Sequence, residues 1–349
     1  MSADPIPVLF VGSFRSTTNG PRGVCEELAA RLRQAGCPVM TTSSKRARFA
    51  RLADMVGTAW RERRRYGVAQ VDVFSGAAFV WAEAVCAALH LARKPYILTL
   101  HGGNLPRFAR RHSARVRRLL RSAAVVTTPS RFLLERLAEY RPDLRFIPNG
   151  LELAAYVPRH RTTVAPRLVW LRAFHRIYNP SLAIRILPML VTRHPDVTLT
   201  MIGDDKGDGS RQAAERLAVD LGVRARVQFH AAVPKTDVPA ALNRADIFLN
   251  TTDVDSAPVT VVEAMACGLC VVTTNVGGIP HLVAHEREAL LVPPDDPRAM
   301  ADAVLRIIDE PTLASRLSHQ GRAQAERFDW SPIIAEWRLL LASTASRAA

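Results

Sequence analysis

Residues 246–280, DIFLNTTDVDSAPVTVVEAMACGLCVVTTNVGGIP, contain two consecutive strand-to-helix turns. Ile247–Asn250 is a short apolar run that predicts a strand, and the polar residues after it lead to Pro258, which suits the first position of a helix. Val259–Cys267 predicts an apolar helix closed by a glycine, and Leu269–Thr273 predicts a second buried strand. In a parallel sheet both turns would lie at the carboxyl edge of neighbouring strands, where ligands bind.

The second turn, Asn275–Pro280, carries two glycines and leads into the next helix. Two helix amino ends would therefore lie at this edge, and each offers unpaired N–H groups and the positive end of a dipole. This arrangement favours a phosphorylated ligand.

Glu263 lies about one turn inside the predicted helix, between wholly apolar flanks. A buried carboxylate without partners is costly, so its side chain must accept hydrogen bonds. The donor is either a tertiary partner such as an arginine or the sugar hydroxyls of a ligand.

The same alternation of strands and helices runs through the whole chain. Apolar runs predict further strands at Val8–Val11, Val71–Phe74, Tyr96–Leu100, Ala123–Thr127, Arg167–Leu171, Val197–Ile202 and Val227–His230. Helices are predicted between them, at Val24–Ala35, Ala78–Leu91, Pro180–Val191, Gln212–Leu221, Val238–Asn243, Ala299–Glu310 and Leu313–Glu326. We expect an α/β protein with two Rossmann-like domains that join near residue 160 and face each other across a cleft.

Composition supports two ordinary globular domains. The chain has 349 residues, of which 48% are hydrophobic, so each domain can bury a core. It contains neither an apolar run long enough to span a bilayer nor a signal-peptide pattern, which predicts a cytoplasmic protein.

The five cysteines are scattered, which predicts reduced thiols. Cys267-x-x-Cys270 followed by His281-x-x-x-His285 approaches a zinc-finger spacing. The ten residues between the pairs are too few and resemble a strand with a turn, so we expect structural thiols and no metal.

The positive charge is confined to the first part of the chain. Residues 1–150 hold 25 Lys and Arg against 10 Asp and Glu, which equals the net charge of +15 of the whole protein. In residues 45–65, apolar side chains at helical spacing lie between arginines, which indicates either an ordinary surface helix or a basic amphipathic helix on an anionic membrane surface. Residues 107–121 add seven arginines. Few aromatic residues accompany these stretches and no binding motif does, so nucleic acid is not expected as a partner.

His101 directly follows a predicted strand and precedes two glycines. A histidine there can be a hydrogen-bonded structural residue. The glycines would also let a ligand approach the backbone closely, which favours a role in a site.

The segment from Asp255 to Gly268, DSAPVTVVEAMACG, resembles the E-x7-E signature of the family-4 retaining glycosyltransferases of GT-B fold. Other residues match motifs of that family in the same order along the chain, namely Gly20, His101-Gly102, Pro129-Ser130, Pro148-Asn149-Gly150, Arg172, Ile202-Gly203-Asp204, Gly277-Gly278 and Phe328-Asp329-Trp330. The resemblance covers most of the chain.

The resemblance assigns roles to individual residues. It implies that Glu263 binds the ribose of a nucleotide-sugar donor and that Asp255 contacts the transferred sugar, helped by the backbone amides of Val259 and Thr260. It also places His101 beside the reacting sugar and Arg172 on the diphosphate. The remaining donor-binding positions that it implies are the glycines Gly20, Gly203, Gly277 and Gly278, the last two forming a turn at the phosphate.

The implied reaction is sugar transfer with retention at the anomeric carbon, without metal or other cofactor, because a cation and helix amino ends neutralise the leaving group. Three positions depart from the family pattern. The first glutamate of the signature is Asp255, and a proline (Pro258) replaces a glycine and removes one backbone donor. The lysine that usually follows the arginine by several residues is absent, and Ile177-Tyr178-Asn179-Pro180 stands there. Arg176 is the candidate to supply the missing charge.

We therefore expect a hexosyltransferase-type glycosyltransferase that uses a UDP- or GDP-sugar and acts on a glycan or lipid-linked acceptor, as in polysaccharide biosynthesis. Residues 1–160 would form the acceptor-side domain, 161–329 the nucleotide-sugar domain, and 330–349 a helix that packs back on the first domain. The basic stretches 45–65 and 107–121 would hold the protein peripherally at the inner face of the cell membrane. A sugar-nucleotide epimerase or phosphorylase of the same fold, or a non-catalytic membrane-associated scaffold, are the alternatives.

Overall fold

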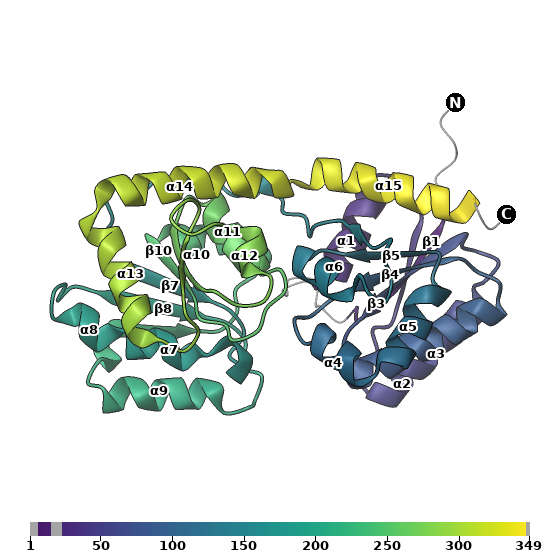
Figure 1. Ribbon diagram of the computed structural model, residues 1–349, viewed down its shortest axis with the longest axis horizontal. Helices are drawn as coiled ribbons and strands as arrows, with labels where there is room; N and C mark the ends of the chain where they lie inside the picture. The colour runs from purple at the N-terminus through teal and green to yellow at the C-terminus, as the bar shows by residue number, and fades with distance from the viewer. Residues whose placement is uncertain (1–5, 15–22, 347–349) are drawn as a thin grey trace. The chain divides into compact units, whose positions relative to one another are not determined.

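The computed structural model of the protein describes residues 6–14 and 23–346. The chain forms two compact units, drawn in Figure 1: unit 1 comprises Met1–Gly150 with Trp330–Ala349, and unit 2 comprises Leu151–Asp329. Residues 151–160 therefore belong to the second unit, whereas the sequence places the division near 160. The reason is that this segment packs in unit 2, where the Leu151 N–H donates to the Phe328 carbonyl oxygen at 2.6 Å.

The described part of unit 1 contains one parallel sheet with the strand order β2-β1-β3-β4-β5-β6. Its strands are β1 Val8–Val11, β2 Val39–Thr42, β3 Val68–Val73, β4 Tyr96–Leu100, β5 Val125–Thr128 and β6 Arg145–Phe146. Its helices are α1 Val24–Gln34, α2 Arg48–Arg61, α3 Ala77–Leu91, α4 Leu105–Arg111, α5 Ser113–Ser122, α6 Arg131–Leu137 and α15 Trp330–Ser346.

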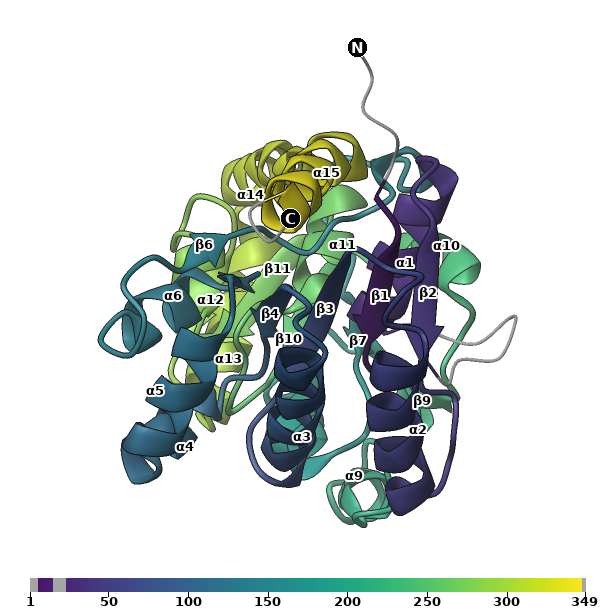
Figure 2. The ribbon, with the colours of Figure 1, turned by 90° about the vertical axis from the view of Figure 1, so that its right-hand side faces the viewer.

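Helices cover both faces of this sheet, as Figure 2 shows. Helices α1 and α15 pack on one face, against Val8, Phe10 and their neighbours on β3, β4 and β5. Helices α2 to α6 pack on the other face, against the alternate residues of the same strands. Because both faces are buried, the strands are nearly continuous apolar runs.

Unit 2 repeats this plan. Its described residues form a parallel sheet with the order β12-β11-β10-β7-β8-β9. The strands are β7 Arg167–Leu171, β8 Thr198–Ile202, β9 Val227–His230, β10 Ile247–Asn250, β11 Cys270–Thr274 and β12 Leu290–Val292. The helices are α7 Pro180–Arg185, α8 Leu187–Val191, α9 Ser210–Asp220, α10 Val238–Asn243, α11 Val259–Ala266, α12 Ile279–Leu282, α13 Pro297–Asp309 and α14 Pro311–Ala325.

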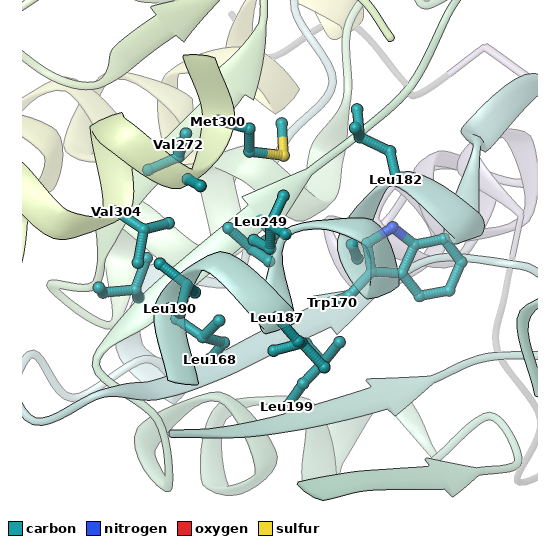
Figure 3. Packing of buried hydrophobic residues seen from close by; sticks show 14 of the residues in the cluster. Leu168, Trp170, Leu182, Leu187, Leu190, Leu199, Leu249, Val272, Met300 and Val304 are labelled. Carbon is teal, nitrogen blue, oxygen red and sulfur yellow. The ribbon is translucent and has the colours of Figure 1, made fainter. Parts of the chain in front are cut away.

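The larger core of unit 2 lies between the sheet and helices α7, α8, α9, α13 and α14. Figure 3 shows how Trp170 of β7 and leucines of the strands and helices interdigitate there. The opposite face of the sheet packs against α10, α11 and α12.

The predicted α/β class is confirmed, and most predicted strands agree with the structure to within a few residues. One long predicted helix, Pro180–Val191, is interrupted, because the chain between α7 and α8 bends just before Pro188, whose ring cannot continue the hydrogen-bond ladder. The basic stretch 107–121 lies on α4 and α5, which His112 separates. Strands β2 and β12 were not predicted, because each has only three or four residues at an outer position of its sheet. Among the described residues no helix combines the length and apolarity required to cross a bilayer.

Candidate functional site

The carboxyl edge of the unit 2 sheet carries Arg172 and Asp255 where the strand order reverses. Arg172 follows β7 and Asp255 lies in the turn after β10, and these strands are neighbours although 75 residues of chain separate their ends. The Nη2 group of Arg172 donates to the Asp255 carboxylate. Such a reversal point is where open α/β sheets bind ligands. The structure thus brings together two of the predicted site residues.

The Arg172 guanidinium has a buried donor left over. Its Nη1 donates to Thr260 Oγ1 at 3.3 Å, and its carbon lies 4.3 Å from the centre of the Tyr178 ring. Its Nε is buried and has no acceptor within the described part of the protein. A buried N–H without an acceptor is costly, so this atom suits an acceptor supplied by a ligand.

Asp255 is held on both carboxylate oxygens. Oδ2 accepts from Arg172, and Oδ1 accepts from the backbone N–H groups of Ser256 at 2.7 Å and Ala257 at 3.3 Å. Helix α11 begins at Val259, four residues after Asp255. Pro258 is therefore its capping residue and not its first helical residue, the position that the sequence indicated for it. The amides of Val259 and Thr260 have no partner in a preceding turn and point with the positive end of the helix dipole.

Glycines hold the two turns together. A Cβ on Gly203 would lie 1.7 Å from the Arg172 carbonyl oxygen, and one on Gly277 would lie 2.0 Å from the Asp255 carbonyl oxygen. Gly277 also has a φ of +53°, which favours glycine. The N–H of Gly278 donates to the same Asp255 oxygen at 3.0 Å, so this amide of the turn is occupied within the protein.

Glu263 is buried in α11, with 2% of its surface exposed. The Tyr156 hydroxyl donates to Glu263 Oε1 at 2.6 Å, and the Lys235 ammonium also donates to Oε1. Glu263 therefore has tertiary partners, as one of the two interpretations of the sequence requires. They are a tyrosine and a lysine, and not an arginine. Because both partners bind one oxygen, Oε2 is the oxygen without a described partner.

His101 follows β4 in unit 1, and its ring is enclosed on two sides. Nε2 lies 3.2 Å from Asp72 Oδ1, and the exposed Phe74 ring stacks on the imidazole with centroids 5.0 Å apart. Burial alone would raise the pKa of Asp72, but His101 together with the Gln70 amide lowers it, so the carboxylate stays charged. A cavity of about 20 Å³, enough for one water, lies beside Asp72 and His101.

Two of the predicted donor-binding residues add little to this geometry. The Arg176 side chain is exposed, and its backbone N–H donates to Asp208, which lowers the pKa of that carboxyl to about 2. Gly20 lies outside the described residues.

Cys267 and Cys270, whose spacing approaches that of a zinc finger, are both buried. The Cys267 and Cys270 thiols lie near the carbonyl oxygens of Pro239 and Ala314, and burial raises the pKa of each thiol to about 12. Cys267 belongs to the core on one face of the unit 2 sheet and Cys270 to the core on the other face, so each thiol takes part in packing and the two do not converge.

The basic stretches of unit 1 form surface helices. Met55 and Ala59 of α2 pack in the core, whereas Phe49 is 89% exposed and Trp60 is 45% exposed. These two aromatic residues lie eleven positions apart and so project from nearly the same side of the helix. Of the seven arginines on α4 and α5, Arg115 pairs with Glu83, and the other six are exposed without a carboxylate partner among the described residues.

Three partners in these sites were not predicted from the sequence: Asp72, Tyr156 and Lys235. For Asp72 a signal exists, since it is a lone carboxylate within the otherwise nonionic run of β3 and so requires a buried partner. Tyr156 and Lys235 lie in short segments without a pattern of their own, and only the fold brings them to Glu263.

Two family descriptions match the chain in succession. Residues 18–155 match the family described as Glycosyltransferase Family 4, and residues 165–324 match Glycosyl transferases group 1. The chain belongs to glycosyltransferase family 4. The resemblance inferred from the signature around Asp255 and Glu263 is thereby confirmed.

Curated relatives carry names of this family. One is a D-inositol 3-phosphate glycosyltransferase from Pseudarthrobacter chlorophenolicus, 25% identical over 72% of this chain and 63% of the relative. Another is a GDP-mannose-dependent alpha-(1-6)-phosphatidylinositol monomannoside mannosyltransferase from Mycolicibacterium smegmatis, 29% identical over 62% of this chain and 61% of the relative. The chain thus spans less than two thirds of the length of these relatives.

Solved structures share the fold of this family-4 protein over nearly its whole length. The Anabaena protein Alr3699/HepE, crystallised with UDP, has a TM-score of 0.78 at 18% identity and covers 97% of this chain and 100% of its own. Sucrose-phosphate synthase from Thermosynechococcus elongatus has a TM-score of 0.79 at 19% identity, with coverage of 97% and 100%. The protein has the GT-B fold, with two Rossmann-like domains, as the sequence predicted.

Proposed function

We propose that this family-4 protein is a retaining, metal-independent glycosyltransferase that moves a hexosyl group from a UDP- or GDP-sugar to a glycan or lipid-linked acceptor. The observation that carries the proposal is the Arg172 guanidinium at the strand-order reversal of unit 2. Its buried Nε has no acceptor among residues 6–14 and 23–346, and the guanidinium lies against Thr260 at the amino end of α11. A fixed cation and free helix amides at one point form a site for a diphosphate.

The other residues divide the donor between them. Glu263 lies one turn further into α11 and would accept the ribose hydroxyls, for which Oε2 is open. Asp255, already oriented by Arg172 and two amides, would accept a hydroxyl of the transferred sugar. The family resemblance assigns His101 of unit 1 to the same sugar. The names of the relatives, one of them GDP-mannose-dependent, support this donor class.

In the proposed reaction the bond from the anomeric carbon to the diphosphate breaks, and the oxygen of an acceptor hydroxyl bonds to that carbon on the same face of the sugar. The proton of the hydroxyl passes to the departing diphosphate. Negative charge develops on the departing diphosphate. Arg172 and the first amides of α11 would stabilise that charge without reorganising, which is how preorganised donors accelerate such steps. The mechanism requires no metal.

A nucleotide-sugar panel with EDTA present tests this function. We expect a UDP- or GDP-sugar to raise the Tm by several degrees near 100 times Kd, where binding adds about 2.7 kcal/mol. With an acceptor, nucleoside diphosphate should be released, and NMR of the product should show the anomeric configuration of the donor. A C-epimerised nucleotide sugar would identify an epimerase instead. No shift with any donor, or activity lost in EDTA, would contradict the proposal.

We further propose that unit 1 binds an anionic membrane surface, through the aromatic side chains of α2 and the arginines of α4 and α5. Phe49 and Trp60 would enter the interface, while the six exposed arginines attract phosphate headgroups. In this way the protein would reach a lipid-linked acceptor at the inner face of the membrane.

The combined substitution Arg117→Gln, Arg118→Gln and Arg121→Gln on α5 should weaken vesicle binding more than 100-fold, at about 1 kcal/mol per charge near an anionic surface. Sedimentation with vesicles containing phosphatidylglycerol measures it, and vesicles of phosphatidylcholine alone should bind little. The matched control replaces three exposed arginines of unit 2, namely Arg216, Arg244 and Arg298, by glutamine. Equal losses in the two triple variants would mean that net charge, and not this surface, drives binding.

A further inference from the structure

One face of the unit 1 sheet changes from apolar to polar toward its carboxyl edge. On the side covered by α1 and α15, the first inward residues of β3, β4 and β5 are Val68, Ile97 and Val125. The next inward residues along the same strands are polar: Gln70, Asp72, Thr99, His101 and Thr127. Buried polar groups are retained where their hydrogen bonds are satisfied, so their pairing shows what the cluster does.

These residues form one connected hydrogen-bond chain. The Gln70 amide donates to Asp72 Oδ1 at 2.8 Å and to Thr99 Oγ1 at 2.8 Å, and the Thr99 and Thr127 hydroxyls lie 3.0 Å apart. Thr127 in turn donates to the Leu98 carbonyl oxygen at 3.2 Å. The chain therefore ends in backbone at one end and at Asp72 and His101 at the other.

Asp72 has His101 as its ionic partner among the described residues. Its side chain is 9% exposed and that of His101 is 11% exposed. A Cβ on Gly12, at the end of β1, would come within 3.2 Å of Asp72 Oδ2, so the glycine leaves space for this carboxylate. The lowered pKa of Asp72 agrees with a carboxylate that stays charged although it is buried.

The His101 imidazole is held by Asp72 at one edge and by Phe74 on one face of the ring. Its Nε2 edge faces Asp72 at 3.2 Å, and its ring lies 20° from the plane of Phe74. Nδ1 has no hydrogen-bond partner in the part of the chain that the structure describes. A carboxylate accepts and cannot donate, so the atom facing it must be Nε2–H, and neutral His101 then carries a lone pair on Nδ1.

We propose that Asp72 is a positioning residue that fixes the His101 proton on Nε2 and so presents Nδ1 as a hydrogen-bond acceptor for a sugar hydroxyl. Phe74 limits rotation of the ring, and the Gln70 amide holds the Asp72 carboxylate in place. The inference rests on the proposed function, in which His101 faces the transferred sugar. The claim that Asp72 sets the tautomer of His101 can be tested without measuring the reaction.

Asp72→Asn is the variant that tests it, because asparagine keeps the shape but can turn its NH₂ toward Nε2 and move the proton to Nδ1. We expect kcat/KM for transfer to fall about 100-fold, with the Kd for UDP or GDP changed less than threefold. Long-range ¹⁵N–¹H NMR of labelled histidine should show His101 as the Nε2–H tautomer in the wild type and as Nδ1–H in the variant. The signal is assigned by its absence in His101→Ala.

Two comparisons separate positioning from a purely structural role. In a His101→Ala background, Asp72→Asn should have no further effect on kcat/KM, because the residue acts through His101. Thr127→Val removes the hydroxyl at the other end of the hydrogen-bond chain, which bonds to Thr99 and to the Leu98 carbonyl oxygen. It should lower Tm while leaving transfer and the His101 tautomer unchanged.

The inference is overturned if Asp72→Asn leaves the tautomer unchanged, or if its loss of activity persists undiminished in the His101→Ala background. If the wild-type protein transfers no sugar from any nucleotide sugar, the proposed function fails. The NMR measurement on the same protein then still decides whether Asp72 sets the tautomer.

Discussion

Glu263→Gln is expected to weaken UDP or GDP binding about 100-fold, with a similar loss in kcat/KM. Hydrogen bonds to a charged acceptor are worth about 1.5 kcal/mol more than neutral ones at best, and two ribose hydroxyls would lose that advantage. Glutamine keeps the volume and an oxygen for the Tyr156 hydroxyl, so the fold is preserved. Lys235 is freed, but its side chain is 46% exposed and can be solvated. Isothermal titration calorimetry measures the change.

Tyr156→Phe is the matched control for Glu263. It removes the 2.6 Å hydrogen bond that orients the carboxylate and should reduce nucleotide affinity by less than tenfold. A Glu263→Gln protein that binds UDP and GDP as tightly as the wild type would contradict the ribose assignment.

Arg172→Ala should produce the largest loss of rate, about 10³-fold in kcat, with a smaller change in nucleotide affinity. The negative charge that the guanidinium opposes grows as the diphosphate departs, so its contribution, about 4 kcal/mol, falls mainly on the transition state. Arg172→Lys should recover only part of the rate, because one ammonium cannot reproduce the planar contacts with both Asp255 and Thr260. Single-turnover kinetics at saturating donor measures the step.

Arg167→Ala provides the comparison for Arg172. Arg167 opens the same strand that Arg172 follows, and it too pairs with an aspartate, Asp246, at 2.9 and 2.7 Å. It lies at the amino edge of the sheet, so its loss should lower Tm and leave kcat unchanged. Equal losses of kcat in the two variants would show that Arg172 acts through stability alone.

The fold was predictable because its strands are buried on both faces. Runs such as Ile247–Asn250 and Tyr96–Leu100 appear as apolar segments of strand length, and the structure has both with those bounds. Short outer strands such as Val39–Thr42 carry less of this signal, since three of its four residues are only half-buried. The helix breaks before Pro188 because proline has no N–H to continue the helical hydrogen bonds. The long apolar pattern of residues 180–191 nevertheless indicated one continuous helix.

The candidate donor site was predictable in part. The E-x7-E resemblance identified Asp255, Glu263 and Arg172 as candidates, and the structure places Arg172 against Asp255. The sequence did not predict which side chains pair with these residues. Lys235 and Tyr156, which bind Glu263, lie 28 and 107 positions from it in the sequence, and Asp72 lies 29 positions from His101. Neither periodicity nor spacing encodes such contacts, because they depend on how separate strands and loops are ordered in the sheet.

The division of the chain at Gly150 and Trp330 bears on how the protein is made. Unit 2 is one continuous segment, so it can complete its core as soon as it has left the ribosome. Unit 1 begins first, yet one face of its sheet is covered only by α1 until α15 is synthesised, because Trp337 and Leu341 belong to that core. We therefore expect the usual order, in which the domain nearest the amino terminus folds first, to be reversed here, with part of the apolar core of unit 1 left incomplete until α15 is made.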